Sequence, residues 1–167
     1  FVDCTVGLGG HAKAILERGA TRLVGLDRDP AALGVARTTL GAFGDRVELV
    51  HADYRTIASV LDARGIHAID GALADLGVSS FQLDQPGRGF SFQRDEPLDM
   101  RMDPTSGSTA ADLIAAASAT DLADAIYTYG EERFSRRIAR AIVEARGTAP
   151  VTTTGRLAAI VRAAVPH

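Results

Sequence analysis

Short apolar runs alternate with amphipathic stretches along the first half of the chain. A buried strand begins at residue 1 and leads into a glycine-rich turn, and similar runs predict strands over 22–27, 47–53 and 68–75. The stretches between them predict helices over 12–18, 30–40 and 57–63, the second starting at a proline suited to a first helical turn. Strands that alternate with helices at this spacing predict right-handed βαβ units and a parallel sheet.

The alternation stops after residue 75. Glycines and prolines punctuate 76–104, where no helical period is sustained. Loops this long are uncommon in compact domains and are often lids or binding loops. Disorder is the alternative, but apolar anchors recur along the segment, so an ordered and packed loop is expected. Among them, Phe90 and Phe92 could offer a stacking face to a base, although packing within the loop is the favoured interpretation.

The remainder of the chain is alanine-rich and helical in pattern. A helix start is expected at 109–112, and further helices over 121–127, capped by Thr120, over 131–146, and from Thr153 or Thr154 to Ala164. No strand alternates with these helices. We therefore expect residues 1–104, with an active-site loop over 76–104, to form one part of the protein and residues 105–167 a separate helical part.

Charge is unevenly divided along the chain, whose net charge is −3. Residues 1–104 hold 11 basic and 15 acidic residues, and residues 105–167 hold 7 and 6. A generally cationic nucleic-acid or membrane binder is excluded, and any such contact requires a local patch. The lone Cys4 allows no internal disulfide, which favours a cytoplasmic location. No apolar run approaches the length that spans a bilayer, so no membrane partner is expected.

Candidate chemistry gathers where the predicted strands end. Gly7, Gly9 and Gly10 follow the first strand and allow a ligand to approach the backbone and the N-terminus of the next helix. Asp27, Asp53 and Asp75 end or follow the other three strands. In an open α/β sheet, ligands bind beyond these carboxyl ends, and an acid after the second strand suits the hydroxyls of a ribose. An adenosine-type cofactor is therefore expected.

The identity of that cofactor stays open from spacing alone. The segment 7–12 also satisfies the G-x-G-x-x-A form used for dinucleotides, so an NAD-dependent oxidoreductase is an alternative. Asp75 and the turn that follows it instead suit a methyltransferase that receives a planar amino group. The glycines could also form a plain strand-to-helix connection, and the chain could be a non-catalytic RNA-binding or ribosome-assembly factor. The four histidines lack metal-ligand spacing, so no metal site is expected.

Six longer motifs make the chain resemble one family. They are D-x-T-x-G-x-G-G-H at 3–11, D-R-D-P at 27–30, D-L-G-V-S-S-x-Q-L-D at 75–84, R-G-F-S-F at 88–92, P-L-D-M-R-M-D at 97–103 and Y-G-E-E-R at 129–133. Together they resemble the bacterial 16S rRNA cytosine-N4 methyltransferases, the MraW or ribosomal RNA small subunit methyltransferase H family. The resemblance runs from residue 1 to about residue 166.

The resemblance implies an S-adenosylmethionine-dependent enzyme that methylates the exocyclic N4 of a cytidine in the decoding region of 16S rRNA. It implies an α/β Rossmann-like methyltransferase core with a parallel sheet, interrupted by a small helical domain that helps recognise the substrate. The residues it implies for cofactor binding are Gly9, Gly10, His11, Asp27, Tyr54, Asp75 and Gln82. Relatives often have Phe where this chain has Tyr54, whose hydroxyl needs a partner.

Two further site hypotheses concern catalysis and RNA binding. Asp75 is the candidate acceptor for a cytosine N4–H, with Ser79 and Ser80 as weaker ones, and the alternative is that Asp75 only orients the cofactor or the loop. The target base would have to be unstacked to reach it. On a helix over 131–146, one stripe opposite the apolar face suits phosphate contacts, with a solvated helix face as the alternative; its members are Arg133, Arg136, Arg137 and Arg140.

The sheet predicted from this chain is incomplete. Methyltransferase sheets of this class have seven strands, and only four are predicted here. We expect further strands to follow residue 167, and the chain as given to be inactive by itself. An exposed sheet edge would also favour self-association, including a homodimer.

Overall fold

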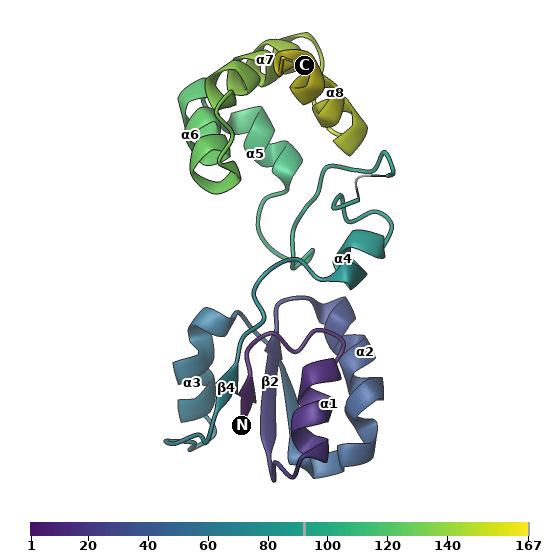
Figure 1. Cartoon of the computed structure of the whole chain (residues 1–167), viewed down its shortest axis with the longest axis vertical. Coiled ribbons are helices and arrows are strands. Elements are labelled where there is room, and N and C mark those ends of the chain that lie inside the picture. The colour runs from purple at the N-terminus through teal and green to yellow at the C-terminus, as the bar shows by residue number, and fades with distance from the viewer. Residues whose placement is uncertain (92, 167) are drawn as a thin grey trace. The chain divides into compact units, whose positions relative to one another are not determined.

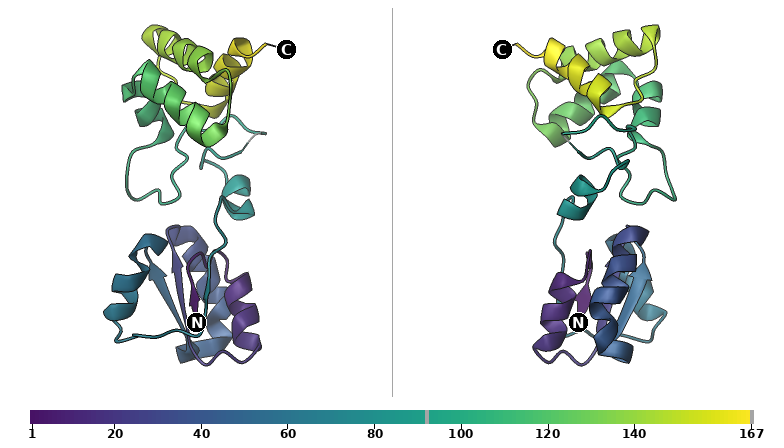
Figure 2. Two further views of the ribbon diagram at one scale, coloured as in Figure 1. Left: turned by 60° about the vertical axis from the view of Figure 1, so that its left-hand side comes forward. Right: turned by 90° about the vertical axis from the view of Figure 1, so that its right-hand side faces the viewer.

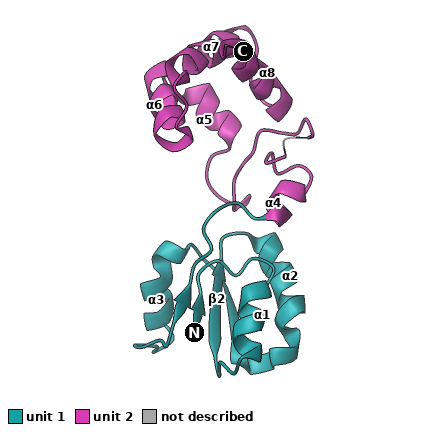
Figure 3. Cartoon of the chain, viewed as in Figure 1, with its two compact units in different colours: residues 1–79 teal, residues 80–167 magenta. Residues whose placement is uncertain are grey.

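The computed structural model describes residues 1–91 and 93–166. The chain divides into two compact units, Phe1–Ser79 and Ser80–His167, which Figure 3 distinguishes by colour. Each unit has its own buried apolar core, and each is described separately below.

The first unit is built on a four-stranded parallel sheet (Figure 1). Its strand order is β3-β2-β1-β4, so the first strand lies between the second and the fourth. Val2 pairs with Val24 on one side and with Ala72 on the other. The predicted parallel sheet is confirmed, although the first and fourth strands are shorter than expected. The strands are β1 (Val2–Asp3), β2 (Leu23–Asp27), β3 (Val47–His51) and β4 (Ala72–Leu73).

Helices cover both faces of this sheet. The helical elements of the unit are α1 (Gly10–Glu17), α2 (Pro30–Leu40), α3 (Ile57–Asp62) and the short 3-10 turns η1 (Gly41–Arg46) and η2 (Tyr54–Thr56). Leu16 of α1 and Leu33 of α2 pack with Leu23 on one face. Val24 and Leu26 of β2 point to the opposite face and pack against α3. This alternation follows from the two-residue period of a strand, and both layers can be followed in Figure 2.

The second unit is helical, and its described residues contain no strand beyond one isolated bridge between Pro97 and Thr153. The four helices after residue 109 surround an apolar core, which Leu98, Ile114 and Ile138 help to form. The absence of alternating strands was expected from the sequence. The helices are α4 (Ser80–Asp84), α5 (Ala110–Ala116), α6 (Ala119–Gly130), α7 (Ser135–Thr148) and α8 (Thr154–Ala164).

Side chains fix the beginnings of three of these helices. Thr109 caps α5 and Ser118 caps α6, each by accepting a hydrogen bond from the backbone N–H of the third residue of its helix. That third residue is Asp112 or Asp121, whose carboxylate in turn accepts a hydrogen bond from the backbone N–H of the capping residue. Ser118 therefore caps α6, and the sequence prediction that Thr120 is the cap is wrong. Thr153 caps α8, as expected.

The start of α7 corrects the sequence prediction. The helix begins at Ser135 and not at residue 131. Glu131 adopts a left-handed conformation, with φ of 52°, which ends α6, and the backbone N–H of Phe134 bonds to the carboxylate of Glu132 at 2.8 Å. Arg133 and Phe134 consequently lie in the turn or at the helix boundary, while the other three arginines of the predicted stripe lie on α7.

The described part of the long loop after residue 84 is packed, as expected, although the short helix α4 lies within the segment 76–104. Glu96 and Leu98 are buried, and their segment pairs with residues 152–154: the Leu98 N–H bonds to the Thr152 carbonyl and the Thr154 N–H to the Glu96 carbonyl, both at 2.9 Å. Phe90 is also buried, which agrees with a packing role, whereas Phe92 lies outside the described residues.

These contacts place the loop from Ser80 onward in the second unit, while residues 76–79 belong to the first. The compact units therefore divide between Ser79 and Ser80, and not at the boundary expected at residue 104. The recognition role expected for the helical part stays a prediction.

Candidate cofactor site

The glycine turn after β1 forms an open cradle at the start of α1. Gly7 and Gly9 adopt positive φ angles of 52° and 91°, which glycine tolerates without steric cost. A Cβ on Gly9 would lie 3.1 Å from Leu40 Cγ, so the turn also packs closely against α2. Space around Gly10 is open, since an added Cβ there would meet no atom within 4 Å.

The N-terminus of α1 is not closed by its own chain. No side chain caps it, whereas Asp29 caps α2 by accepting a hydrogen bond from the Ala31 N–H. The first backbone N–H groups of a helix have no partner inside the helix, and the helix dipole adds partial positive charge there. Gly10 and His11 are exposed at this position, so their backbone can receive a polar ligand.

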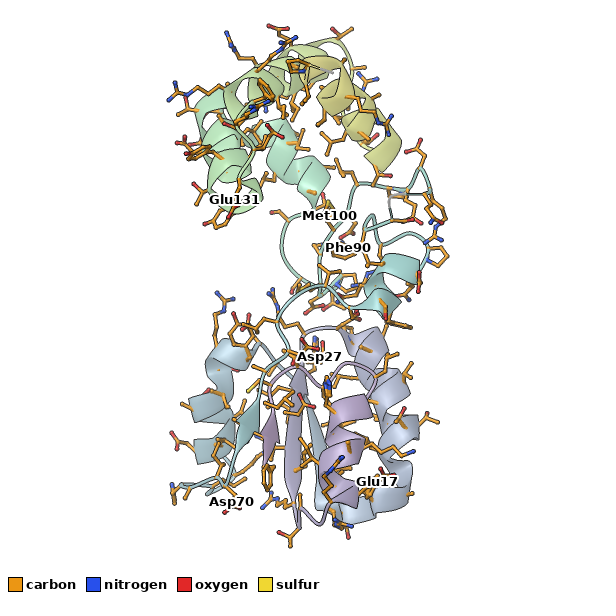
Figure 4. The ribbon with its side chains drawn as sticks, viewed as in Figure 1. Glu17, Asp27, Asp70, Phe90, Met100 and Glu131 are labelled. Carbon is orange, nitrogen blue, oxygen red and sulfur yellow. The ribbon has the colours of Figure 1, made fainter. Side chains whose placement is uncertain are left out.

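Asp27 fixes the shape of the cradle from the neighbouring strand. One carboxylate oxygen accepts a hydrogen bond from the Gly7 N–H at 2.7 Å, and the other accepts one from the Asp29 N–H at 2.8 Å. Figure 4 labels Asp27 at the end of β2, beside the loop that follows β1. The side chain is half-buried, and each oxygen retains a further lone pair for a ligand hydroxyl.

Asp3 is a buried carboxylate at the end of β1. Its Oδ1 accepts a hydrogen bond from the Thr5 N–H at 3.1 Å, while its Oδ2 has no partner among the described residues. Burial raises the pKa of Asp3, and the negative charges of Asp27 and Asp75 add to this, against the Thr5 hydrogen bond and the positive charge of His11. An unsatisfied buried oxygen is costly unless a ligand or water donates to it.

Asp3 is the first residue of the motif at 3–11, but the sequence predicts no role for it. The available signal was an acidic residue inside an apolar strand, directly before the glycine turn. Burial and the orphaned oxygen depend on the tertiary structure, because β2 and β4 flank β1 on both sides.

Thr5 joins the glycine loop to the segment after β4. Its hydroxyl oxygen accepts a hydrogen bond from the backbone N–H of Asp75 at 2.7 Å. The Cys4 N–H bonds to the Leu73 carbonyl at 2.8 Å, so the two segments run together for several residues. Asp75 is exposed and lies at the same edge of the sheet as the cradle.

The carboxylate of Asp53 is already engaged by side chains of the protein and is not offered to a ligand. Both of its carboxylate oxygens accept hydrogen bonds from the Arg55 guanidinium, at 3.0 and 2.7 Å, and Arg28 lies 3.5 Å away. The Arg55 hydrogen bonds lower the pKa of Asp53 to about 2. Its side chain also caps η2 through the Arg55 N–H, so ordinary capping explains this strand-end acid. Tyr54, which follows it, is 41% exposed.

The remaining predicted residues belong to the second unit. Gln82 lies on α4 and is buried, so its part in a cofactor site stays a prediction. The arginine stripe lies on α7 and the turn before it, and its four members are all exposed. Across residues 1–91 and 93–166, no cluster of His, Cys, Asp and Glu is suited to hold a metal ion, and no helix has the length and apolar character to cross a membrane.

A parallel sheet between two helical layers, with a glycine turn and acids at its carboxyl ends, defines a Rossmann-like methyltransferase fold. Comparison with known families gives the same class. The chain belongs to the MraW methylase family, whose model matches residues 1–167. The resemblance stated from the motifs is thereby confirmed.

Several curated relatives are similar over nearly the whole chain, and each is named ribosomal RNA small subunit methyltransferase H. The protein from Mycobacterium marinum is 53% identical over 99% of this chain and 43% of its own length. Those from Cereibacter sphaeroides and Geotalea uraniireducens are 54% and 51% identical over 100% of this chain, and over 49% and 54% of their own lengths. The chain thus spans about half the length of the curated relatives it matches.

Proposed function

We propose that the protein transfers a methyl group from S-adenosylmethionine to small-subunit ribosomal RNA, at the exocyclic N4 of a cytidine in the decoding region. Membership of the MraW methylase family and the names of the relatives support rRNA methylation. The observation that carries the proposal is the uncapped start of α1, behind a glycine turn that Asp27 holds open beside Asp75.

The residues at this edge of the sheet fit S-adenosylmethionine. Gly9, Gly10 and His11 offer backbone N–H groups and open space, and Asp27 offers acceptors for ribose hydroxyls. The unsatisfied Oδ2 of Asp3 is an acceptor for a further donor of the ligand. Tyr54 presents an exposed ring face suited to an adenine. When bound, the cofactor supplies a methyl group made electrophilic by its sulfonium.

Asp75 is the residue we assign to the amino group of the substrate. Alignment of the nitrogen with the methyl carbon supplies most of the catalysis in such a transfer, and ideal alignment in model systems is worth about 7–11 kcal/mol. A carboxylate that accepts an N4–H hydrogen bond favours a pyramidal nitrogen with an available lone pair. The hydrogen bond from the Asp75 N–H to Thr5 holds that carboxylate's backbone in place. The alternative role is orientation of the cofactor alone.

RNA contacts are assigned to the second unit. Arg136, Arg137 and Arg140 lie on α7, and Arg133 precedes it. Phosphate contacts by such a stripe make binding depend steeply on salt. Changing Arg136 and Arg140 to Glu is therefore expected to weaken RNA binding without changing cofactor affinity, and unchanged RNA binding would remove the stripe from the proposal.

Cofactor binding and methyl transfer are tested separately. Calorimetry is expected to show binding of S-adenosylhomocysteine and none of NADH, whereas the reverse would support the dinucleotide enzyme that the glycine spacing also allows. The full-length protein, given labelled S-adenosylmethionine and immature small subunits, is expected to yield N4-methylcytidine on nucleoside analysis. Cofactor binding without any methyl transfer would favour a non-catalytic assembly factor. Asp75→Asn is expected to keep both affinities and to slow transfer; a normal rate would leave Asp75 only an orienting role.

A further inference from the structure

Tyr129 is a solvent-exposed aromatic residue at the end of α6. It is 87% exposed, more than any other exposed large apolar or aromatic residue of the described chain. It follows Leu122 by seven residues and Ile126 by three, so the helical period places it on the side of α6 that packs into the core. The core ends before the last turn of the helix, and among the described residues the ring has no packing partner in that core.

The turn that follows holds this ring at a fixed place. Glu131 ends α6 with φ of 52°, a conformation that costs a residue with a Cβ about 1–2 kcal/mol. Its backbone N–H still bonds to the carbonyls of α6, and Glu132 accepts the Phe134 N–H at 2.8 Å. Arg133 lies over the Phe134 ring, 4.6 Å from its centroid. Tyr129 is therefore presented from an ordered turn; Figure 4 labels Glu131 at this place.

Positive charge begins directly after the turn. Within the described part of the chain, none of the stripe's members forms an ion pair with a carboxylate; they are Arg133, Arg136, Arg137 and Arg140. The Nε of Arg140 donates to the Arg136 carbonyl of its own helix at 3.3 Å, whereas the guanidinium groups of Arg146 and Arg156 donate to carbonyls at the ends of α5 and α7. The stripe is thus available to an anionic partner, with Glu131 and Glu132 reducing its net charge.

We propose that Tyr129 stacks on an unpaired base of the RNA substrate while the arginine stripe contacts the adjoining phosphates. This inference rests on the proposed function and adds a mode of recognition to it. Tyr129 and the stripe follow one another closely along the chain, and exposed aromatic rings together with cations are the combination by which proteins hold single-stranded nucleic acid. Bases of a duplex are stacked on one another, so an exposed ring on a helix end selects an unpaired strand. A duplex offers only its phosphates and groove edges to the same surface.

The test compares affinities for a short single-stranded RNA and for a duplex of the same sequence. Tyr129→Ala is expected to weaken single-strand binding about 5- to 100-fold, the range for loss of one stacked base. Tyr129→Phe keeps the ring and is expected to bind within about twofold of the unsubstituted protein. Tyr127→Ala is the matched control, because this tyrosine is also exposed on α6, at 63%, but lies about 200° around the helix.

Salt dependence separates stacking from charge. Tyr129→Ala is expected to leave the slope of log affinity against log salt unchanged, whereas Arg136→Gln and Arg140→Gln each reduce it by about 0.7. Because the ring is exposed, the melting temperature of the Tyr129→Ala protein should match that of the unsubstituted protein. Equal losses with Tyr127→Ala and Tyr129→Ala, an equal loss on single strand and duplex, or no single-strand binding at all would each overturn the inference.

Methyl transfer is read independently of these affinities. Single-strand affinity that depends on Tyr129, in a full-length protein that transfers no methyl group, would leave this inference standing and remove the proposed function. Normal N4 methylation, together with unchanged RNA affinity in Tyr129→Ala, would support the proposed function and remove this inference. Binding of an unstructured acidic peptide with the same dependence on Tyr129, and of RNA with none, would identify a protein partner and contradict the assignment to RNA.

Discussion

Asp27 shapes the glycine turn, and in the proposed function the same carboxylate also receives the ribose. Its two oxygens hold the backbone of Gly7 and of Asp29, at 2.7 and 2.8 Å, before any ligand is considered. The sequence could predict an acid at this strand end, and the use of this acid for a ribose stays a prediction. It could not predict that the same acid fixes the glycine turn, since that contact joins residues twenty positions apart in the chain.

Asp27→Asn tests this double use. The amide nitrogen cannot accept a hydrogen bond, so one backbone N–H loses its acceptor, at a cost of about 1–3 kcal/mol in the free energy of unfolding. We expect a loss of that size in urea denaturation, together with weaker binding of S-adenosylhomocysteine by calorimetry. Asp45→Asn, at an exposed position of η1, is the control and should change neither. Unchanged stability in Asp27→Asn would show that the turn does not depend on this carboxylate.

Asp53 gives a prediction in pH. The Arg55 hydrogen bonds lower its pKa from 3.8 to about 2. A group whose pKa is lowered on folding stabilises the protein above its unfolded pKa, and this contribution is lost as the pH falls through the folded value. The unfolding free energy of the unsubstituted protein should therefore exceed that of Asp53→Asn at pH 6, and the difference should shrink between about pH 4 and 2. Asparagine retains capping ability, so the comparison isolates the charge. A difference independent of pH would contradict it.

Met100 carries backbone strain that glycine would relieve. Its φ is 59°, and its N–H bonds to the Arg88 carbonyl at 3.0 Å; Figure 4 labels it within the long loop. The side chain is 45% exposed, so little packing is lost on its removal. Met100→Gly is expected to raise the free energy of unfolding by up to about 1 kcal/mol, after the entropy cost of glycine. Met102→Gly, without a positive φ, should lower it in the same denaturation experiment. A loss of stability in both would contradict the strain argument.

At the scale of elements, the sequence predicts the end of a helix correctly where neighbouring residues alone determine that end. The helix predicted over 30–40 is α2, Pro30–Leu40, since proline and the preceding aspartate mark its start. The start of α7 was wrong by four residues. Gly130 stands where a helix-ending glycine is expected, yet the left-handed conformation falls on Glu131, which the contacts of the turn determine. The ends of β1 and β4 depend on pairing across the sheet and were also misjudged.

Arg146 joins two helices of the second unit. Its guanidinium donates to the carbonyls of Ile114 and Ala117 at the end of α5. Arg146→Met keeps an apolar stem of similar length but leaves those carbonyls without that donor, so we expect a loss of about 1–3 kcal/mol in the free energy of unfolding. Arg140→Met, on the exposed side of the same helix, should change stability by less than about 0.5 kcal/mol. Equal effects in chemical denaturation would show that the α5 contact contributes nothing.

At the scale of the whole molecule, the sequence indicated two parts but misplaced the boundary between them. Composition changes near residue 104, whereas the contacts change at Ser79. The difference arises because the loop is fastened to residues that lie about sixty positions later, including Thr154 and Gly155. Pairing over such a separation leaves no periodic signal in the sequence. The parallel sheet, in contrast, follows from local alternation and was predicted.

The segment between the units is open to proteases. Residues 75–78 are all exposed, and Leu76 is 64% exposed. Chymotrypsin at low concentration is expected to cut first after Leu76, and mass spectrometry would identify the fragments. S-adenosylhomocysteine should slow this cut, because the proposed site includes the neighbouring Asp75. First cleavage inside the loop 85–104, or a rate insensitive to the ligand, would contradict this.

The pairing of residues 94–98 with 152–155 also has a consequence for biosynthesis. The four strands that the structure describes in the first unit all precede residue 80, so they can pair with one another once that point has left the ribosome. The second unit must wait for Thr152–Gly155, because the Glu96 carbonyl and the Leu98 N–H bond to backbone groups of that segment. Domains that fold as units do so in order of synthesis, and long-range pairings form late. The glycine turn and its contact with Asp27 should therefore form on the nascent chain before the helices of the second unit can close around their own core.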